Sequence, residues 1–165
     1  MKRICLVGSA VAVCLLASVA GTAIAASGKS KTTKVPCSVK TTIVPAAGDS
    51  AVSPPASQGT EFGSANCGGG LGHGVQADSF TVPDSGDTVA KYTMYFATGS
   101  VHGTYDLTPQ SSSLNFLATT WTGTMKVTGG TGTWKGVKGT GTMKCSSADG
   151  VHTSCKDHLK LKMAG

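Results

Sequence analysis

The chain has 165 residues, with 14 lysines and arginines against 8 acidic residues and a formal net charge of +6. This length suits one domain with a sizeable core. The only arginine is Arg3, so the rest of the chain has none. Nucleic-acid binding, which relies on arginine and on aromatic side chains interleaved with basic ones, is therefore not expected.

The first 25 residues have the pattern of an export signal. Lys2 and Arg3 precede an almost unbroken apolar run at 4–20, and AIA at 23–25 is a small-x-small cleavage site. A membrane anchor is the alternative, but no basic stop-transfer flank follows, and no later stretch could span a bilayer. Cleavage removes Lys2 and Arg3, so 12 basic residues would face 8 acidic ones, a net charge of +4. We expect a periplasmic or secreted protein.

Four cysteines lie beyond this segment, and an even number in an exported chain indicates disulfides with three possible pairings. An Asp-Gly turn signal at 149–150 lies midway between Cys145 and Cys155. A three-residue loop there would place these two cysteines opposite each other, at a separation that a disulfide can span. This favours Cys145–Cys155 and leaves Cys37–Cys67 by elimination. A metal site is the alternative, but the spacings fit no CxxC pattern, and we expect no metal and no cofactor.

In chain order, residues 26–34 are Ser, Gly, Lys and Thr and are expected to form a disordered lead-in. Residues 35–44 are rich in β-branched side chains and predict a strand. Residues 45–74 are rich in Pro, Gly, Ser and Ala and predict a long loop with at most one short edge strand, tied down by Cys67. Further strands are predicted over 75–82, 89–97, 101–107, 114–127, 138–145 and 155–163.

These strands predict an all-β protein. No segment has a convincing helical period, and short strands between Gly and Pro turns indicate a sandwich or a closed barrel. Gly123, Gly139 and Gly141 have inward parity beside Met125 and Met143. Small inward residues let a strand bend sharply, which favours a small closed antiparallel barrel. The apolar parity of 114–127 also changes along its length, between positions 116 and 121, which predicts a bulge or two short strands.

A five-residue motif occurs three times at nine-residue intervals, as TGTMK from Thr122, TGTWK from Thr131 and TGTMK from Thr140. Calcium-binding repeats need an aspartate that is missing here, and no Gly-Lys-Ser/Thr completes a P-loop. We predict that the outer copies are strands and that 129–137 connects them, with its glycines supplying the positive φ angles of a tight turn. The expected turn and plug residues are Gly129, Gly130, Gly132, Trp134 and Val137.

The segment VTGGTGTWKGVKGTG (127–141) resembles the V-x-GGTG-x-(aromatic)-x-x-(A/V)-x-G signature of the dirigent and allene oxide cyclase-like barrels. YFATGSVHGTYDL (95–107) resembles the upstream hairpin of their bacterial secreted relatives. The resemblance touches roughly residues 89–145 and implies an eight-stranded calycin-like barrel with an apolar pocket open at one end. Family members close reactive intermediates into rings, steer radical couplings, or have no known activity.

The resemblance does not carry catalytic residues over to this chain. The signature is structural, and catalytic members of the family place Asp, Glu, Arg or Tyr inside the pocket. Here arginine is absent beyond the signal peptide, and the only glutamate, Glu61, falls in the predicted loop.

Five other residues have inward parity and are candidates for a site. A buried carboxyl of Asp78 or Asp157 could act as an acid or base; the alternative is that each is solvated or hydrogen-bonded near a strand end. Tyr92, Tyr105 and Trp121 could hold an apolar ligand, or they could simply fill the core of a barrel this small.

Six lysines share outward parity and predict a basic stripe on the outer surface. It could attract an anionic envelope surface, or it could simply keep the protein soluble. The four histidines show no metal spacing and are expected at the surface. The lysines are Lys126, Lys138, Lys144, Lys156, Lys160 and Lys162.

Together, these features predict a signal peptide at 1–25 and a single β-barrel domain at 35–165. We expect the barrel to be non-catalytic and to bind a small apolar ligand or an envelope surface. The alternative is a cofactor-free cyclase or isomerase of the allene oxide cyclase or dirigent kind. Pocket volume separates the two, because a filled barrel leaves no room for a substrate, whereas an open cavity with a carboxylate at its floor favours an enzyme.

Overall fold

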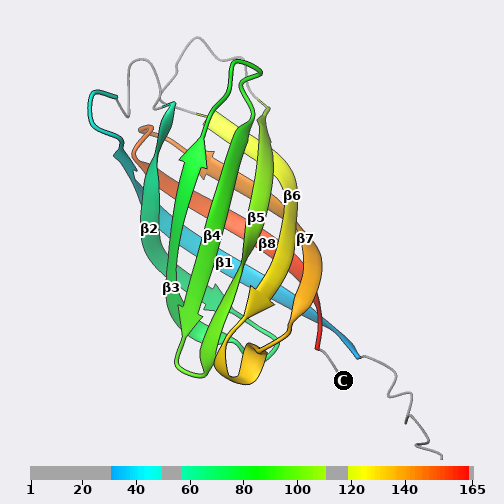
Figure 1. The fold of residues 1–165 in the computed structure, drawn as a ribbon. Helices are drawn as coiled ribbons and strands as arrows, with labels where there is room; N and C mark the ends of the chain where they lie inside the picture. The colour runs from blue at the N-terminus through cyan, green and yellow to red at the C-terminus, as the bar shows by residue number, and fades with distance from the viewer. Residues whose placement is uncertain (1–30, 50–56, 111–118, 164–165) are drawn as a thin grey trace, which may run out of the picture.

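The computed structural model describes residues 31–49, 57–110 and 119–163. Each strand is antiparallel to the next, and pairing of the first strand with the last closes the barrel (Figure 1). The elements are β1 (Thr32–Pro45), β2 (Gln58–Cys67), β3 (Gly72–Thr81), β4 (Thr88–Phe96), β5 (Gly99–Pro109), β6 (Thr119–Gly130), the 3₁₀ turn η1 (Gly132–Trp134), β7 (Lys138–Ser147) and β8 (His152–Lys162). The predicted closed antiparallel barrel of about eight strands is confirmed.

Some predictions concern parts of the chain outside the described residues. These are the signal peptide at 1–25, the start of the lead-in, and the Phe116 end of the predicted parity change. Within the described ranges, no helix has the length and apolar character needed to cross a bilayer.

Alternate residues of each strand point into the barrel and form one core, as the two-residue period of a strand requires. The two TGTMK copies lie on β6 and β7 and pair with each other, so that Gly123 faces Met143 and Met125 faces Gly141. A Cβ on Gly123 would lie 1.8 Å from the carbonyl oxygen of Asp106. A glycine thus lies opposite each inward methionine, and at Gly123 a side chain would collide with the backbone of β5.

The middle copy of the motif closes one end of the barrel at η1 (Figure 1). Trp134 and Val137 are buried there, and the indole Nε1 of Trp134 donates a hydrogen bond of 3.2 Å to Thr98 Oγ1. Gly132 has a φ of 58°, as the predicted turn needs.

The prediction of positive φ was wrong for Gly129 and Gly130, which extend β6 opposite His102 and Val101. Glycine is needed there for space, because a Cβ on Gly130 would come within 2.4 Å of the carbonyl oxygen of Ser100.

Both predicted disulfides, Cys37–Cys67 and Cys145–Cys155, are present, and each joins residues directly opposite on neighbouring strands. The loop between the second pair is longer than predicted, since the last ladder pair is Ser147–Thr153. Asp149 orders this loop by accepting hydrogen bonds from backbone amides, including that of His152 at 2.7 Å.

The predicted long loop at 45–74 was wrong for its second half. Residues 58–67 form β2, a full strand paired along its length with β1 and β3. Its small residues mark close backbone contact, because a Cβ on Gly63 would lie 1.9 Å from the carbonyl oxygen of Lys40. The first strand also begins at Thr32, three residues before the predicted start.

Candidate functional site

A pocket of about 370 Å³ opens at the end of the barrel opposite η1. At this end of the barrel β1, β3, β5 and β7 end and β2, β4, β6 and β8 begin. Every strand contributes residues to the pocket wall. Most of the lining is apolar, and the Cys145–Cys155 disulfide forms part of it. The main apolar side chains are Ile43, Phe80, Val82, Leu107, Trp121 and Met143.

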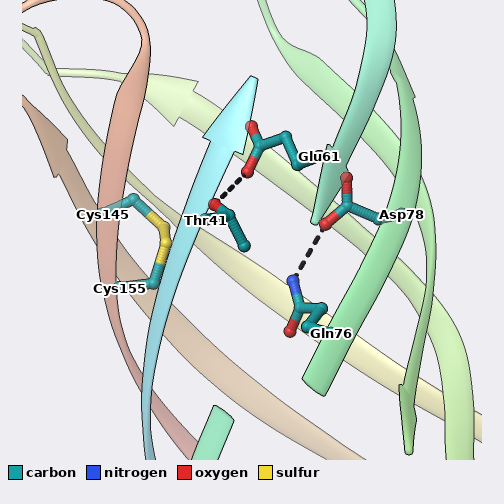
Figure 2. The surroundings of a disulfide bond; sticks show 6 residues. All are labelled: Thr41, Glu61, Gln76, Asp78, Cys145 and Cys155. Carbon is teal, nitrogen blue, oxygen red and sulfur yellow. Dashed lines mark hydrogen bonds between the residues drawn. A yellow bond between two sulfur atoms is a disulfide. The ribbon is translucent and has the colours of Figure 1, made fainter. Parts of the chain in front are cut away.

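Glu61 on β2 is the one carboxyl that lines this pocket among the described residues. Its side chain is half-buried, and its Oε2 accepts a hydrogen bond of 2.5 Å from the Oγ1 of the buried Thr41 (Figure 2). Burial raises the pKa of Glu61, and the Thr41 hydrogen bond partly opposes this rise. The neutral acid, which can donate a hydrogen bond into the pocket, is therefore more populated than at a solvated glutamate.

Asp78 lies directly opposite Glu61 in the β2–β3 ladder and is only 7% exposed. Its Oδ2 accepts a hydrogen bond of 2.9 Å from Gln76 Nε2 (Figure 2), and its Oδ1 has no hydrogen-bond partner in the described part of the chain. Burial, followed by the charge of Glu61, raises the pKa of Asp78 to about 7. Two adjacent carboxyls thus share a poorly solvated site in which both are hard to ionise together.

Tyr105 on β5 also lines the pocket. Burial, and then the negative charges of Asp78 and Glu61, raise the pKa of its hydroxyl well above its ordinary value. Tyr105 is therefore a phenol at neutral pH and offers a proton donor beside the acid pair.

Asp157 on β8 lies deeper in the barrel and does not line the pocket. It is 0% exposed, faces Cys37 and Met143 across the neighbouring strands, and neither oxygen has a hydrogen-bond partner among the described residues. Burial alone raises its pKa to about 7. The Asp157 carboxyl is thus enclosed, away from any molecule in the pocket.

The three predicted aromatic residues all point inward, but two of them line the pocket and the third lies in the core. Trp121 and Tyr105 line the pocket, whereas Tyr92 is buried in the core and its hydroxyl lacks a partner in the described structure. The rings of Tyr92 and Tyr105 are stacked with centroids 6.3 Å apart. Tyr92 therefore fills the core beneath the aromatic side chains that line the pocket.

Sequence reasoning placed Asp78 inside the barrel but missed Glu61. The signal that could have found it is parity with Cys67, because cysteine side chains are usually buried and Cys67 is buried here. Glu61 and Cys67 are six residues apart, so in one regular strand they face the same way.

Within the described ranges, no group of three or more His, Cys, Asp or Glu side chains is placed to hold a metal ion.

No protein-family model matches the sequence, and no curated protein matches it. Among solved structures, the chain is similar to a pterocarpan synthase dirigent protein, with a TM-score of 0.57 and 15% identity over 84% of this chain and 89% of that one. The fold is dirigent-like. A weaker similarity, to a pyocyanin demethylase, has a TM-score of 0.40 and 21% identity over 79% of this chain and 99% of the other, which is too low to support an argument.

Proposed function

We propose that this protein is an exported binding barrel that takes a small, mostly apolar molecule into the pocket at its open end. The observation that carries this proposal is the apolar cavity of about 370 Å³. Small-molecule sites typically measure about 300–1,000 Å³ and combine apolar walls with a few polar groups. The pocket has both features.

The polar groups limit the class of ligand. Besides three threonines, Glu61 and Tyr105 are the polar side chains that a ligand would touch, and Asp78 lies beside Glu61 on the neighbouring strand. An anionic ligand would meet two carboxyls in a poorly solvated site. A neutral molecule with a carbonyl, ether or ring nitrogen could instead accept a hydrogen bond from the protonated Glu61 or from Tyr105. We therefore assign a neutral, largely apolar ligand with one hydrogen-bond acceptor.

Export is the second part of the proposal. The two disulfides fit an oxidising compartment outside the cytoplasm. The proposed signal peptide at 1–25 would release a chain that begins at Ala26 and carries a single barrel domain after a short lead-in. N-terminal sequencing of the exported protein tests this, and a start at Met1 would contradict it. The anionic envelope surface expected as another partner would meet the outside of the barrel, not this pocket.

The pocket can be tested without knowing its natural ligand. Nile red is an uncharged apolar dye whose emission rises in an apolar site, and one saturable site is expected. Thr88→Trp would fill the pocket from the start of β4, and Thr93→Trp, outward on the same strand, is the matched control. Thr88→Trp should weaken dye binding at least tenfold, and Thr93→Trp should not. Equal loss in both variants would contradict the proposal.

Catalysis is the second candidate, and the Glu61–Asp78 pair favours it. Burial raises the pKa of both carboxyls, that of Asp78 to about 7, and a carboxyl with a raised pKa can act as an acid or a base. In a cofactor-free cyclisation or isomerisation, Glu61 would touch the substrate, and Asp78 would set its protonation state. The molecules extracted from wild-type and Asp78→Asn protein, each from the exporting host, decide between the candidates. Different compounds would indicate a blocked reaction, and the same compound in both would indicate binding alone.

A further inference from the structure

One side of the outer surface carries eight lysines and, among its described outward positions, no acidic residue. These positions belong to β1, β6, β7 and β8, which are neighbours in the closed sheet (Figure 1). We call this surface the basic face. It consists of Lys34, Lys40, Lys126, Lys138, Lys144, Lys156, Lys160 and Lys162, all exposed.

Lysines lie directly opposite each other at three places on the basic face. The pairs are Lys34 with Lys160, Lys138 with Lys162, and Lys144 with Lys156. Like charges in directly opposed positions destabilise a sheet. Soluble surfaces normally mix both signs of charge, so keeping the protein soluble does not account for this placement. An anion that bridges the pairs would remove the repulsion.

A hollow of about 410 Å³ lies on the same side, between β2, β1 and β8. Its polar lining includes Ser38, Asn66, Lys156 and His158, and Lys156 Nζ donates a hydrogen bond of 2.9 Å to Ser38 Oγ. The hollow therefore combines a held cation with neutral hydrogen-bonding groups. Sugar units that carry an acidic substituent present the complementary groups.

The residues between the lysines narrow the class of partner. The outward positions of β7 between Lys138 and Ser146 are Thr140, Thr142 and Lys144, and β6 and β8 add further Thr, Ser and His residues. Stacking of nucleic-acid bases needs aromatic side chains, and these strands present none outward. Membrane attachment uses apolar side chains beside the basic ones. Two exposed apolar side chains lie at the edge of the basic face, Val44 at the end of β1 and Phe62 opposite Thr42 on β2, and the others, Val75, Val89 and Tyr95, lie on β3 and β4. None lies on β6, β7 or β8, which carry six of the eight lysines.

From the opposed lysines, the hydroxyl-rich surroundings and the polar hollow, we propose that the basic face binds a linear anionic polysaccharide. From Lys156 to Lys162 the row runs for about 20 Å along β8, at about 3.3 Å per residue. A chain lying along it would place several carboxylate or sulfate groups against the lysine pairs. This activity is separate from the pocket, which opens at the end of the barrel.

The test measures binding of polygalacturonate and dextran sulfate by calorimetry at low and at physiological ionic strength, with neutral dextran as the blank. Lys144→Gln/Lys156→Gln removes the opposed pair beside the hollow. Lys91→Gln/Lys135→Gln removes the same charge from β4 and from the turn after η1, and it is the matched control. Nile red binding confirms that each variant keeps a folded pocket.

We expect both acidic polysaccharides to bind and neutral dextran not to bind. The Lys144/Lys156 variant should lose about tenfold or more in affinity and show a shallower dependence on salt, because fewer counterions are released. The control should change less than twofold. Equal losses in the two variants, or no binding at low salt, would overturn the proposal. So would tighter binding to single-stranded DNA or to anionic lipid vesicles than to either polysaccharide.

Discussion

Glu61 and Asp78 lie directly opposite each other on β2 and β3, with both side chains inside the barrel. Burial disfavours the charged form of both carboxyls, and the charge on Glu61 further opposes ionisation of Asp78. Only Glu61 reaches the pocket wall, so Asp78 influences a ligand chiefly through the protonation of its neighbour.

The first prediction concerns this pair. Glu61→Gln removes the charge that helps to raise the pKa of Asp78, so Asp78 should titrate at lower pH, while burial keeps its pKa above the ordinary value of 3.8. Carboxyl-carbon NMR titration measures this. Asp157 is the internal control, because burial alone raises its pKa. If Asp78 titrates as in the wild type, the two carboxyls are not coupled.

The second prediction concerns stability and pH. Asp157 has a folded pKa of about 7 against an ordinary value of 3.8, so the folded protein binds this proton more tightly than the unfolded chain. Its contribution to stability is therefore fully present below about pH 4, is lost as the pH rises towards 7, and stays lost above. Asp78 adds a change of the same sign. Wild-type stability should accordingly fall between pH 4 and 7.5.

Asp157→Asn should flatten this fall and make the protein more stable than wild type above pH 7, by up to about 4 kcal/mol. Urea unfolding at several pH values measures the effect. Asp106→Asn, which removes an exposed carboxyl on β5, should keep the wild-type slope. A variant Asp157→Asn with the wild-type slope would show that this carboxyl is solvated in solution.

The third prediction compares the disulfides. Each should stabilise the protein by about 2–4 kcal/mol, mainly by restricting the unfolded chain. Cys37–Cys67 spans 30 residues and Cys145–Cys155 spans 10, so loop entropy makes the first worth about 1 kcal/mol more. Unfolding of the two double-serine variants tests the order. Nile red binding should weaken only without Cys145–Cys155, because that disulfide lines the pocket. A reversed order would mean that loop entropy does not decide their contributions.

The fourth prediction separates the two ends of the barrel. Trp134→Ala empties the plug and should cost about 3–5 kcal/mol, whereas Trp134→Phe keeps most of the packing and should cost less. In the folded fraction of either variant, the affinity for Nile red should match wild type, because the pocket lies at the other end. A large loss of affinity with Trp134→Phe would show that the plug and the pocket are linked.

Much of the fold could be predicted because its determinants are local. The alternation of apolar and polar residues over 155–163 predicts β8, and the Asp-Gly turn signal predicts the Cys145–Cys155 disulfide. The GGTG segment predicts the turn and plug that close one end of the barrel. The prediction failed at β2, where Gly59 and Gly63 lie close to the backbone of β1. Close contact between strands and loop flexibility both select small residues, so composition alone does not distinguish them.

The site was predicted only in part for the same reason. Parity placed Asp78 and Tyr105 inside the barrel, and it placed Trp121 there as well, although the apolar parity changes along the segment 114–127. Glu61 lies on β2, which was predicted to be a loop because of its composition. The usual placement of polar and apolar side chains is also reversed there, because Glu61 points inward and its outward neighbour Phe62 is 57% exposed. That the barrel has an open pocket follows from how the side chains of eight strands meet, which no single segment of sequence contains.

The claim that the pocket binds a small molecule is tested most directly by native mass spectrometry of protein purified from its exporting host. The predicted spectrum shows the chain from Ala26 less four hydrogens, for two disulfides, together with one discrete small neutral molecule. Thr88→Trp protein should lack that molecule, and Thr93→Trp protein should keep it. A spectrum with only the bare chain in all three proteins would contradict the account and move the function to the outer surface.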